Sequence, residues 1–282
     1  MPFNNIIGRL DANGLIPDEA ANQIIQVAVQ ESAALALCRT ARMSSQVYSQ
    51  PVLSALPVSY WVGGDTGLKQ TSESAWSDVV LNAEELAVVI PCPINILEDS
   101  TFDVWAEITP GIAQAFAARL DAAILSGDAK PASWPEAIVP AAVAAGNVAT
   151  ADSTAEQGGV INDLSELLDL VEGDGYDATA YAADRALRGL LRKARSTTGE
   201  SLGEGSTSNV WDMDITYAVS GTLPAGPPAT LAVAGDWSLA VVGVRQDLRL
   251  EVFREGVISD DQGAVVLNLL QQDSAALRCT GR

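Results

Sequence analysis

The sequence FDVWAEITPGIAQAFAARLDAAILSG, residues 102–127, carries the longest helical pattern of the chain. Its large apolar residues recur at steps of three or four, which is the spacing of one face of an α-helix. We predict a helix over residues 102–126 that ends at Gly127, because glycine is common just beyond a helix C-terminus. Pro110 lies inside the pattern and is expected to kink the helix or divide it in two. The predicted apolar face consists of Phe102, Trp105, Ile108, Ile112, Phe116, Leu120 and Ile124.

The segments that flank this helix read as strands. EELAVVIPCPINILED (84–99) starts as a buried strand and ends in a turn, and DLRLEVF (247–253) alternates polar and apolar residues. AVVLNLL (264–270) is the last strand that the sequence predicts. We expect the late strands to pair with the early one near residue 88, so the predicted fold class is α+β.

Composition shifts divide the chain into four predicted parts. The first is an arm that contains a helix running from Pro17 to about Cys38, and the second is a hairpin. The core is interrupted by an inserted lobe, whose boundary is a stretch rich in Pro, Ala and Gly. The ranges are 1–50 for the arm, 51–82 for the hairpin, 83–130 and 236–282 for the core, and 131–235 for the inserted lobe.

The inserted lobe contains two predicted helices. VINDLSELLDLVEG (160–173) is amphipathic and stops at glycines, and DRALRGLLRKAR (184–195) follows an extended segment. The arginines of the second helix share one side. This side is either a solvated face or a contact with an acidic neighbouring subunit. It consists of Arg185, Arg188, Arg192 and Arg195.

Residues 51–82 are predicted to form an extended β-hairpin. VSYWV (58–62) and AWSDVVL (75–81) read as its strands, and about a dozen polar, glycine-rich residues lie between them. A two-stranded hairpin is at best marginally stable alone in water. Trp61 and Trp76 therefore need apolar cover from elsewhere, and we expect this hairpin to lie on another subunit.

The tip of this hairpin, GGDTGLKQT (63–71), superficially resembles a phosphate loop. In that motif glycine directly precedes lysine, and Ser or Thr directly follows it. Here Leu68 separates Gly67 from Lys69, and Gln70 follows the lysine. The backbone amides and the lysine would not converge on one phosphate, so the sequence does not predict a nucleotide site here.

The composition excludes several classes of function. The 282 residues carry a net charge of −20 and include three lysines, so the chain is not expected to bind DNA tightly. The sequence has no histidine, which removes the commonest general base and metal ligand. Its cysteines, Cys38, Cys92 and Cys279, lie far apart and are expected to be reduced, buried thiols. We predict no cofactor, no metal and no membrane span.

The order of these parts resembles the major capsid proteins of tailed double-stranded DNA bacteriophages, which have the Hong Kong 97-type fold. MSSQVYSQPVLSALP, YWVGGDTGLKQT and AWSDVVLNAEELAVVIPCPINILEDS are similar to the arm, extended loop and first core strand of that family. FDVWAEITPGIAQAFAARLDAAILSG is similar to its spine helix, KPASWP to the exit into the axial lobe, and AGDWSLAVVGVRQDLRLEVFREG to the return into the peripheral lobe. The resemblance is strongest to capsids of actinobacterial-type phages.

The resemblance gives the predicted parts their roles. The core becomes the peripheral domain with its spine helix, the inserted lobe becomes the axial domain, and the hairpin becomes the loop that reaches over a neighbouring subunit. A lysine of this loop forms an isopeptide bond to a neighbour's asparagine in some family members, which makes Lys69 and Asn268 a candidate cross-link beside the alternative of an ordinary solvated charge. The implied interface residues are Tyr60, Trp61, Gly63, Gly64, Gly67, Lys69 and Trp76.

The leading hypothesis is a structural protein whose pentamers and hexamers form an icosahedral shell around phage DNA. An encapsulin shell that encloses cargo enzymes is the alternative on the same fold, and a cargo enzyme encoded nearby would favour it. An enzyme is a third class, but the acidic pairs Glu84–Glu85 and Asp260–Asp261 read as surface charge because adjacent strand residues point to opposite faces. The expected partners are copies of this chain, a separate scaffolding protein, a portal and decoration proteins. The expected location is the virion, after assembly in the host cytoplasm.

Overall fold

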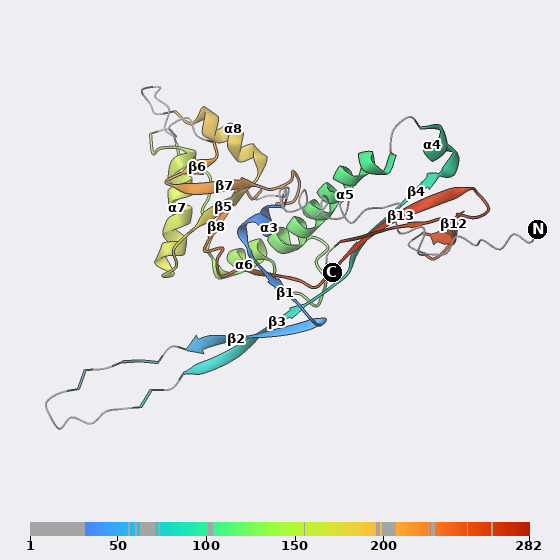
Figure 1. Cartoon of the computed structure of the whole chain (residues 1–282). Coiled ribbons are helices and arrows are strands. Elements are labelled where there is room, and N and C mark those ends of the chain that lie inside the picture. Colours follow the sequence, from blue (N-terminus) through green and yellow to red (C-terminus); the bar gives the residue numbers. More distant parts are fainter. Residues whose placement is uncertain are drawn as a thin grey trace, which may run out of the picture.

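The computed structural model describes most of the chain beyond the N-terminal 31 residues. The described residues are 32–55, 57–59, 61–62, 71–72, 74–100, 104–154, 156–195, 198, 207–224, 226, 229–246, 248–260 and 262–282. The helix predicted from Pro17 lies mostly outside this part, as does Phe102, and the described end of that helix is the short helix α3 (Ala33–Leu37). Figure 1 shows a two-lobed body, with helix α5 between the lobes and a long hairpin projecting away from it.

Helix α5 (Val104–Asp121) continues as a π-helix, η1 (Ala122–Ser126). It passes through Pro110 without dividing, and Gly127 ends it with a φ of +79°, as predicted. The predicted apolar face is correct at Ile112 and Phe116, but Leu125 is buried where Ile124 was expected. The wider turns of the π-helix shift the register of the last residues, and a pattern read at α-helical spacing cannot anticipate this shift.

One end of this helix packs on the peripheral sheet, whose strand order is β10-β13-β4. Val88 pairs with Cys279 of β13, so the prediction that the strands at 247–253 and 264–270 pair with the strand near residue 88 is wrong: β10 shares the sheet but pairs with β13, and the strand at Val265–Asn268 lies in another sheet. Strand β4 is at the sheet edge, where its two prolines, Pro91 and Pro93, are tolerated. The strands are β4 (Leu86–Pro93), β10 (Arg249–Phe253) and β13 (Ser274–Gly281), and helix α4 (Ile94–Asp99) follows β4.

The central strand β13 was missed by the sequence prediction, which placed no strand after residue 270. Its sequence, SAALRCTG, is short of large β-branched residues, so it has little strand signal. It is nevertheless buried along much of its length because it lies between two strands and beneath α5. Tertiary position, not local propensity, makes this segment a strand.

The axial lobe contains a four-stranded sheet of order β6-β7-β5-β8. All four residues of β5 are buried, and three of them are alanines, whose small side chains let helices approach the sheet closely. Tyr181 and Ala183 face the core under α7 and α8, whereas Ala180 and Ala182 face the core that contains Leu125. The elements are α6 (Ile138–Ala145), α7 (Val160–Gly173), β5 (Ala180–Ala183), α8 (Arg185–Lys193), β6 (Asn209–Val210), β7 (Met213–Tyr217) and β8 (Ala232–Gly235).

The remaining strands form three two-stranded pairs. The hairpin β2–β3 projects from the body (Figure 1), β1 pairs in parallel with β9, and β11 pairs with β12. The prediction of a strand at 58–62 is wrong at its described residues, because the first hairpin strand lies earlier and pairs with β3. The bounds are β1 (Arg39–Arg42), β2 (Val47–Ala55), β3 (Ala75–Asn82), β9 (Val241–Val244), β11 (Val257–Ser259) and β12 (Val265–Asn268).

Candidate subunit interface

The β2–β3 hairpin exposes apolar side chains on both of its faces. Cross-strand partners share a face, so Tyr48 and Leu81 lie on one face, and Val47 and Asn82 lie on the other. Val52 and Val79 continue the first face, and Val80 and Trp76 continue the second. Among the described residues the exposed large apolar side chains of this region are Val47, Tyr48, Val52, Val58, Trp61, Val62, Trp76, Val79 and Val80.

Such exposure is unusual for a strand pair of this composition. Trp76 keeps 67% of its surface accessible, and Trp61 is fully exposed. An antiparallel pair normally covers one apolar face with its own core and leaves a polar face to water. The hairpin has no such division, so complete cover of its apolar residues requires contacts on both sides.

The root of the hairpin is fixed to the body by a polar clamp. Trp134 Nε1 donates to the Asn82 carbonyl at 3.0 Å, and Asn82 Nδ2 donates to the Ser133 carbonyl at 3.0 Å. Ser133 Oγ in turn donates to Glu84 Oε1 at 2.5 Å. The sequence prediction placed this segment at the exit to the axial lobe and missed Trp134 as an anchor. A tryptophan between prolines was the available signal.

The predicted interface residues divide into two groups. Trp61 and Trp76 are described and exposed, which is the condition that an interface role requires. The other members lie outside the described residues, so their roles stay predictions. These are Tyr60, Gly63, Gly64, Gly67 and Lys69.

Asn268, the other member of the candidate cross-link, lies at the end of β12. Its Nδ2 donates to Gln271 Oε1 at 3.0 Å, and its backbone N–H donates to Gln272 Oε1 at 3.2 Å. The residue is half-buried and its side chain is engaged in a local turn. A cross-link at this position would have to break the side-chain bond to Gln271.

A buried carboxylate joins the described start of the chain to the spine helix. Asp121, at the end of α5, has no solvent exposure. It accepts hydrogen bonds from Ser32 Oγ at 2.7 Å, Ala33 N at 2.9 Å and Ala34 N at 3.0 Å. Burial raises the pKa of Asp121 above its usual 3.8, and the three hydrogen bonds oppose that rise. The sequence prediction did not single out Asp121, because one acid inside an amphipathic helix is an ordinary surface charge.

The three cysteines are free and buried, as predicted. Burial raises the pKa of Cys38 and of Cys279 to about 11. Asp121 adds to the rise at Cys38 by charge repulsion. Both thiols are therefore protonated at neutral pH and behave as small apolar side chains.

The four predicted arginines of the axial lobe are exposed. The Arg188 guanidinium lies over the Tyr217 ring, 4.2 Å from its centroid. Arg192 Nε donates to the Arg188 carbonyl at 3.3 Å, and Arg195 donates to the carbonyl of Ala194 at 3.2 Å. Arg185 begins α8, whose N-cap is Asp184. Arg185, Arg188 and Arg192 lie on α8, whereas Arg195 lies beyond its end at Lys193, and a contact of these arginines with another subunit stays a prediction.

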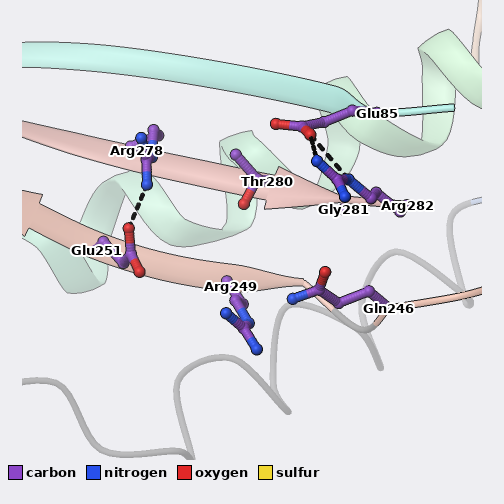
Figure 2. A pocket seen from close by; sticks show the side chains of 8 residues that line it. All are labelled: Glu85, Gln246, Arg249, Glu251, Arg278, Thr280, Gly281 and Arg282. Carbon is purple, nitrogen blue, oxygen red and sulfur yellow. Dashed lines mark hydrogen bonds and ion pairs between the residues drawn. The ribbon is translucent and has the colours of Figure 1, made fainter.

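A polar groove of about 260 Å³ on the peripheral sheet has a different arrangement of charge (Figure 2). Arg278 pairs with Glu251, and Arg282 pairs with Glu85. Arg278 also lies 4.5 Å from the centre of the Phe253 ring. These two arginines are neutralised by carboxylates of the same chain, whereas Arg249, which also lines the groove, is in neither of these ion pairs.

Two other kinds of site are absent from the described residues. Across that part of the chain, no group of three or more Cys, Asp or Glu side chains is arranged to hold a metal ion. In the same residues, no helix combines the length and the apolar character needed to cross a membrane.

The architecture defines the class of this protein as a shell subunit. A spine helix joins a peripheral sheet to an axial lobe, and a long hairpin with two apolar faces projects away from both. A model of the phage capsid family matches residues 12–272. The chain belongs to the phage capsid family.

Comparisons with individual proteins agree with this assignment. The chain is 24% identical over 281 residues to a protein named major capsid protein from Staphylococcus phage 80alpha, covering 98% of this chain and 83% of that one. It is similar to a structure from Microbacterium phage Oxtober96, with 32% identity and a TM-score of 0.77 over 98% of this chain and 91% of the other. A structure from Mycobacterium phage Cain gives 28% identity and a TM-score of 0.79 over 98% and 90%.

These findings confirm the resemblance that the sequence carries, including its likeness to capsids of actinobacterial phages. The chain is a major capsid protein of a tailed phage, and its place is the virion. The comparisons give the encapsulin alternative no support.

Proposed function

We propose that copies of this chain assemble as pentamers and hexamers into a closed icosahedral shell around the phage genome, and that each β2–β3 hairpin lies across a neighbouring copy. The observation that carries the proposal is the exposure of apolar side chains on both faces of the hairpin, with Trp76 on one face and Val79 on the other. A neighbouring subunit supplies the cover that one chain lacks. Trp61, beyond the end of β2, adds a large apolar surface to the same contact.

The charge of the chain supports enclosure of DNA without tight binding. A net charge of −20 repels phosphate, so packaged DNA would be confined by the wall and not attached to it. The same charge must be tolerated where copies meet, which makes assembly sensitive to salt. The proposed role is structural and not enzymatic. Family membership supports this role, and so does a sequence that lacks histidine.

Electron microscopy of the purified protein after a sucrose gradient tests the proposal. Uniform closed particles with five-fold and six-fold clusters are expected, either from this chain alone or after co-expression with genes for a scaffold and a portal. Decoration proteins would add density on the outside of such particles. A chain that remains monomeric in both preparations would contradict the proposal.

The candidate cross-link between Lys69 and Asn268 has its own test. A covalent bond between copies would give a ladder of bands when purified shells are boiled and run on a denaturing gel. Lys69→Arg keeps the charge and removes the reacting amine, so the ladder should disappear in that variant while shells persist. A single band from wild-type shells would show that Lys69 is an ordinary charged residue of the loop.

A further inference from the structure

Two neighbouring helices of the axial lobe carry opposite charge. Helices α7 and α8 pack on the same face of the axial sheet, through a core that contains Leu168 and Leu187 (Figure 1). Their outer surfaces are exposed. That of α7 carries Glu166, Asp169 and Glu172, and that of α8 carries Arg185, Arg188 and Arg192.

The described residues contain no ion pair that neutralises these groups. Glu166 accepts a hydrogen bond from Asn162 at 2.8 Å, and Arg188 is held over Tyr217. Neither contact cancels a charge. The contrast with the groove of Figure 2 is direct, because Arg278 and Arg282 there have carboxylate partners in the same chain. The charges on α7 and α8 remain available to another molecule.

Helix α7 holds its acids at a cost to its own stability. Glu166, Asp169 and Glu172 follow at steps of three, so like charges lie next to one another along the helix. The last turn contains no basic residue, although the C-terminal end of a helix favours a cation. A guanidinium supplied from outside would relieve both effects.

An exposed apolar side chain lies on or just after each of the two helices. Tyr176, just after α7, keeps 54% of its surface accessible, and Leu190 on α8 keeps 41%. Contacts between proteins commonly place aromatic residues and arginine at the centre of the interface. Tyr176 lies close in sequence to the acids of α7 and can give the acidic surface an aromatic centre. Leu190 is two residues from both Arg188 and Arg192, so it lies on a different side of α8 from the arginines.

We propose that α8 of one copy packs against α7 of the next copy, with Arg188 and Arg192 facing Asp169 and Glu172. This inference rests on the proposed assembly into rings, and it names the charged contact that closes them. A head-to-tail ring requires two different surfaces on every subunit, which the acidic and basic helices provide. The opposite charges also set the direction of the ring, because α8 against α8 and α7 against α7 are repulsive.

Cross-linking with introduced cysteines tests the contact. The variant Asp169→Cys with Arg192→Cys keeps the native thiols, which are buried. Mild oxidation of assembled protein should give a ladder that extends beyond the dimer, because each copy would bond to two neighbours. The matched control is Glu98→Cys with Arg192→Cys. Residue 98 is exposed in α4, at the other end of α5, and should give no ladder (Figure 1).

Two outcomes of this experiment overturn the inference. Dimers alone would mean a two-fold contact and not a ring. Assembled particles without cross-links would mean that α7 and α8 do not meet, although the shell itself would stand. If the wild-type chain forms neither rings nor shells, the proposed assembly itself is wrong, and the contact between α7 and α8 that depends on it is wrong as well.

Charge reversal gives an independent test. Arg188→Glu with Arg192→Glu should lower the assembled fraction on the order of tenfold at ordinary salt, because attraction becomes repulsion. Asp169→Arg with Glu172→Arg should do the same. The four substitutions combined restore opposite charges and should recover most of the assembly. Equal assembly by all variants, or a combined variant that fails while its monomer keeps the wild-type melting temperature, would overturn the contact.

Discussion

The β2–β3 hairpin and the axial sheet contain similar residues in opposite surroundings. Valine, tyrosine and alanine occur in both, yet β5 is buried along its whole length and β3 is exposed along most of its length. The axial sheet has helices on both faces. Beyond its root, the hairpin is covered on neither face by the described part of its own chain. One region therefore folds within the subunit, whereas the other has the composition of a core and gains that core only when copies meet.

Removal of the hairpin should abolish assembly, which is the largest effect that we expect. Val47 pairs with Asn82, so residues 48–81 can be replaced by an Asn-Gly turn that joins the paired ends. Shell formation should be lost completely, while the melting temperature of the monomer stays close to that of wild type. Sucrose gradients and calorimetry measure the two properties. Shells from the shortened chain would show that the hairpin is not an assembly element.

Truncation of apolar side chains should separate the two regions by stability. Leu191 is buried in the axial core, and Leu191→Ala should cost about 2–5 kcal/mol of unfolding free energy. Val80 is exposed on the hairpin, and Val80→Ala should change the monomer by less than about 0.5 kcal/mol. Urea titration of the free subunit measures both values. A comparable loss from Val80→Ala would mean that the hairpin is covered within the monomer.

Loss of the buried carboxylate should destabilise the junction between arm and spine. Asp121→Ala leaves Ser32 Oγ and the amides of Ala33 and Ala34 without their acceptor, at a cost of about 3 kcal/mol. The exposed neighbour Asp128 is the control, and Asp128→Ala should be nearly neutral. Urea titration measures both variants. A small effect at Asp121 would mean that the arm is not held through this residue.

The effect of Asp121 on folding stability should depend on pH in a defined direction. The pKa of Asp121 is raised in the folded protein, so the folded state holds its proton more tightly than the unfolded state. Proton binding by Asp121 therefore stabilises the folded state. This stabilisation is fully present below pH 3.8 and is lost as pH rises through the folded pKa of Asp121. The unfolding free energy of wild type minus that of Asp121→Asn should therefore fall as pH rises from 3.8 and then become constant. If this free-energy difference instead rises with pH, the pKa of Asp121 is lowered and not raised by folding.

The smallest expected effect concerns a hydroxyl inside the axial core. Tyr181 is fully buried, and its hydroxyl has no hydrogen-bond partner within the described structure. Burial raises the pKa of Tyr181 to about 12, and the charge of Glu172 adds to the rise. Tyr181→Phe removes the unpaired group and should be neutral or stabilising by up to about 1 kcal/mol. A loss of more than that amount, measured by urea titration, would reveal a partner for the hydroxyl.

The sequence predicted best the elements that carry their own periodic signal. The helices around Leu168 and Leu187 were placed correctly, because apolar residues at steps of three and four define one face. Strand β13 was missed, since its residues are small and its burial comes from its neighbours. The hairpin was predicted, but its first strand was placed after Pro57 and not before it. VSYWV has a stronger strand composition than the paired segment around Pro51.

The candidate interface was predictable in kind and not in detail. The tryptophans of the hairpin indicated that apolar surface needed a partner, and their exposure agrees with that hypothesis. The clamp at Trp134 and the junction at Asp121 were not predictable, because each joins residues far apart in sequence. The arginines of α8 were found by spacing. Their acidic counterpart on α7 became apparent only when the two helices were seen on one sheet.

Hydrogen exchange on free subunits and on assembled shells tests most directly whether the hairpin acquires its core from a neighbour. The amides of β2 and β3 should exchange rapidly in the free subunit and at least about a hundredfold more slowly in the shell, because an uncovered two-stranded hairpin opens easily. Those of β5 and α7 should be protected in both states. Hairpin amides that exchange equally fast in the shell would contradict the account.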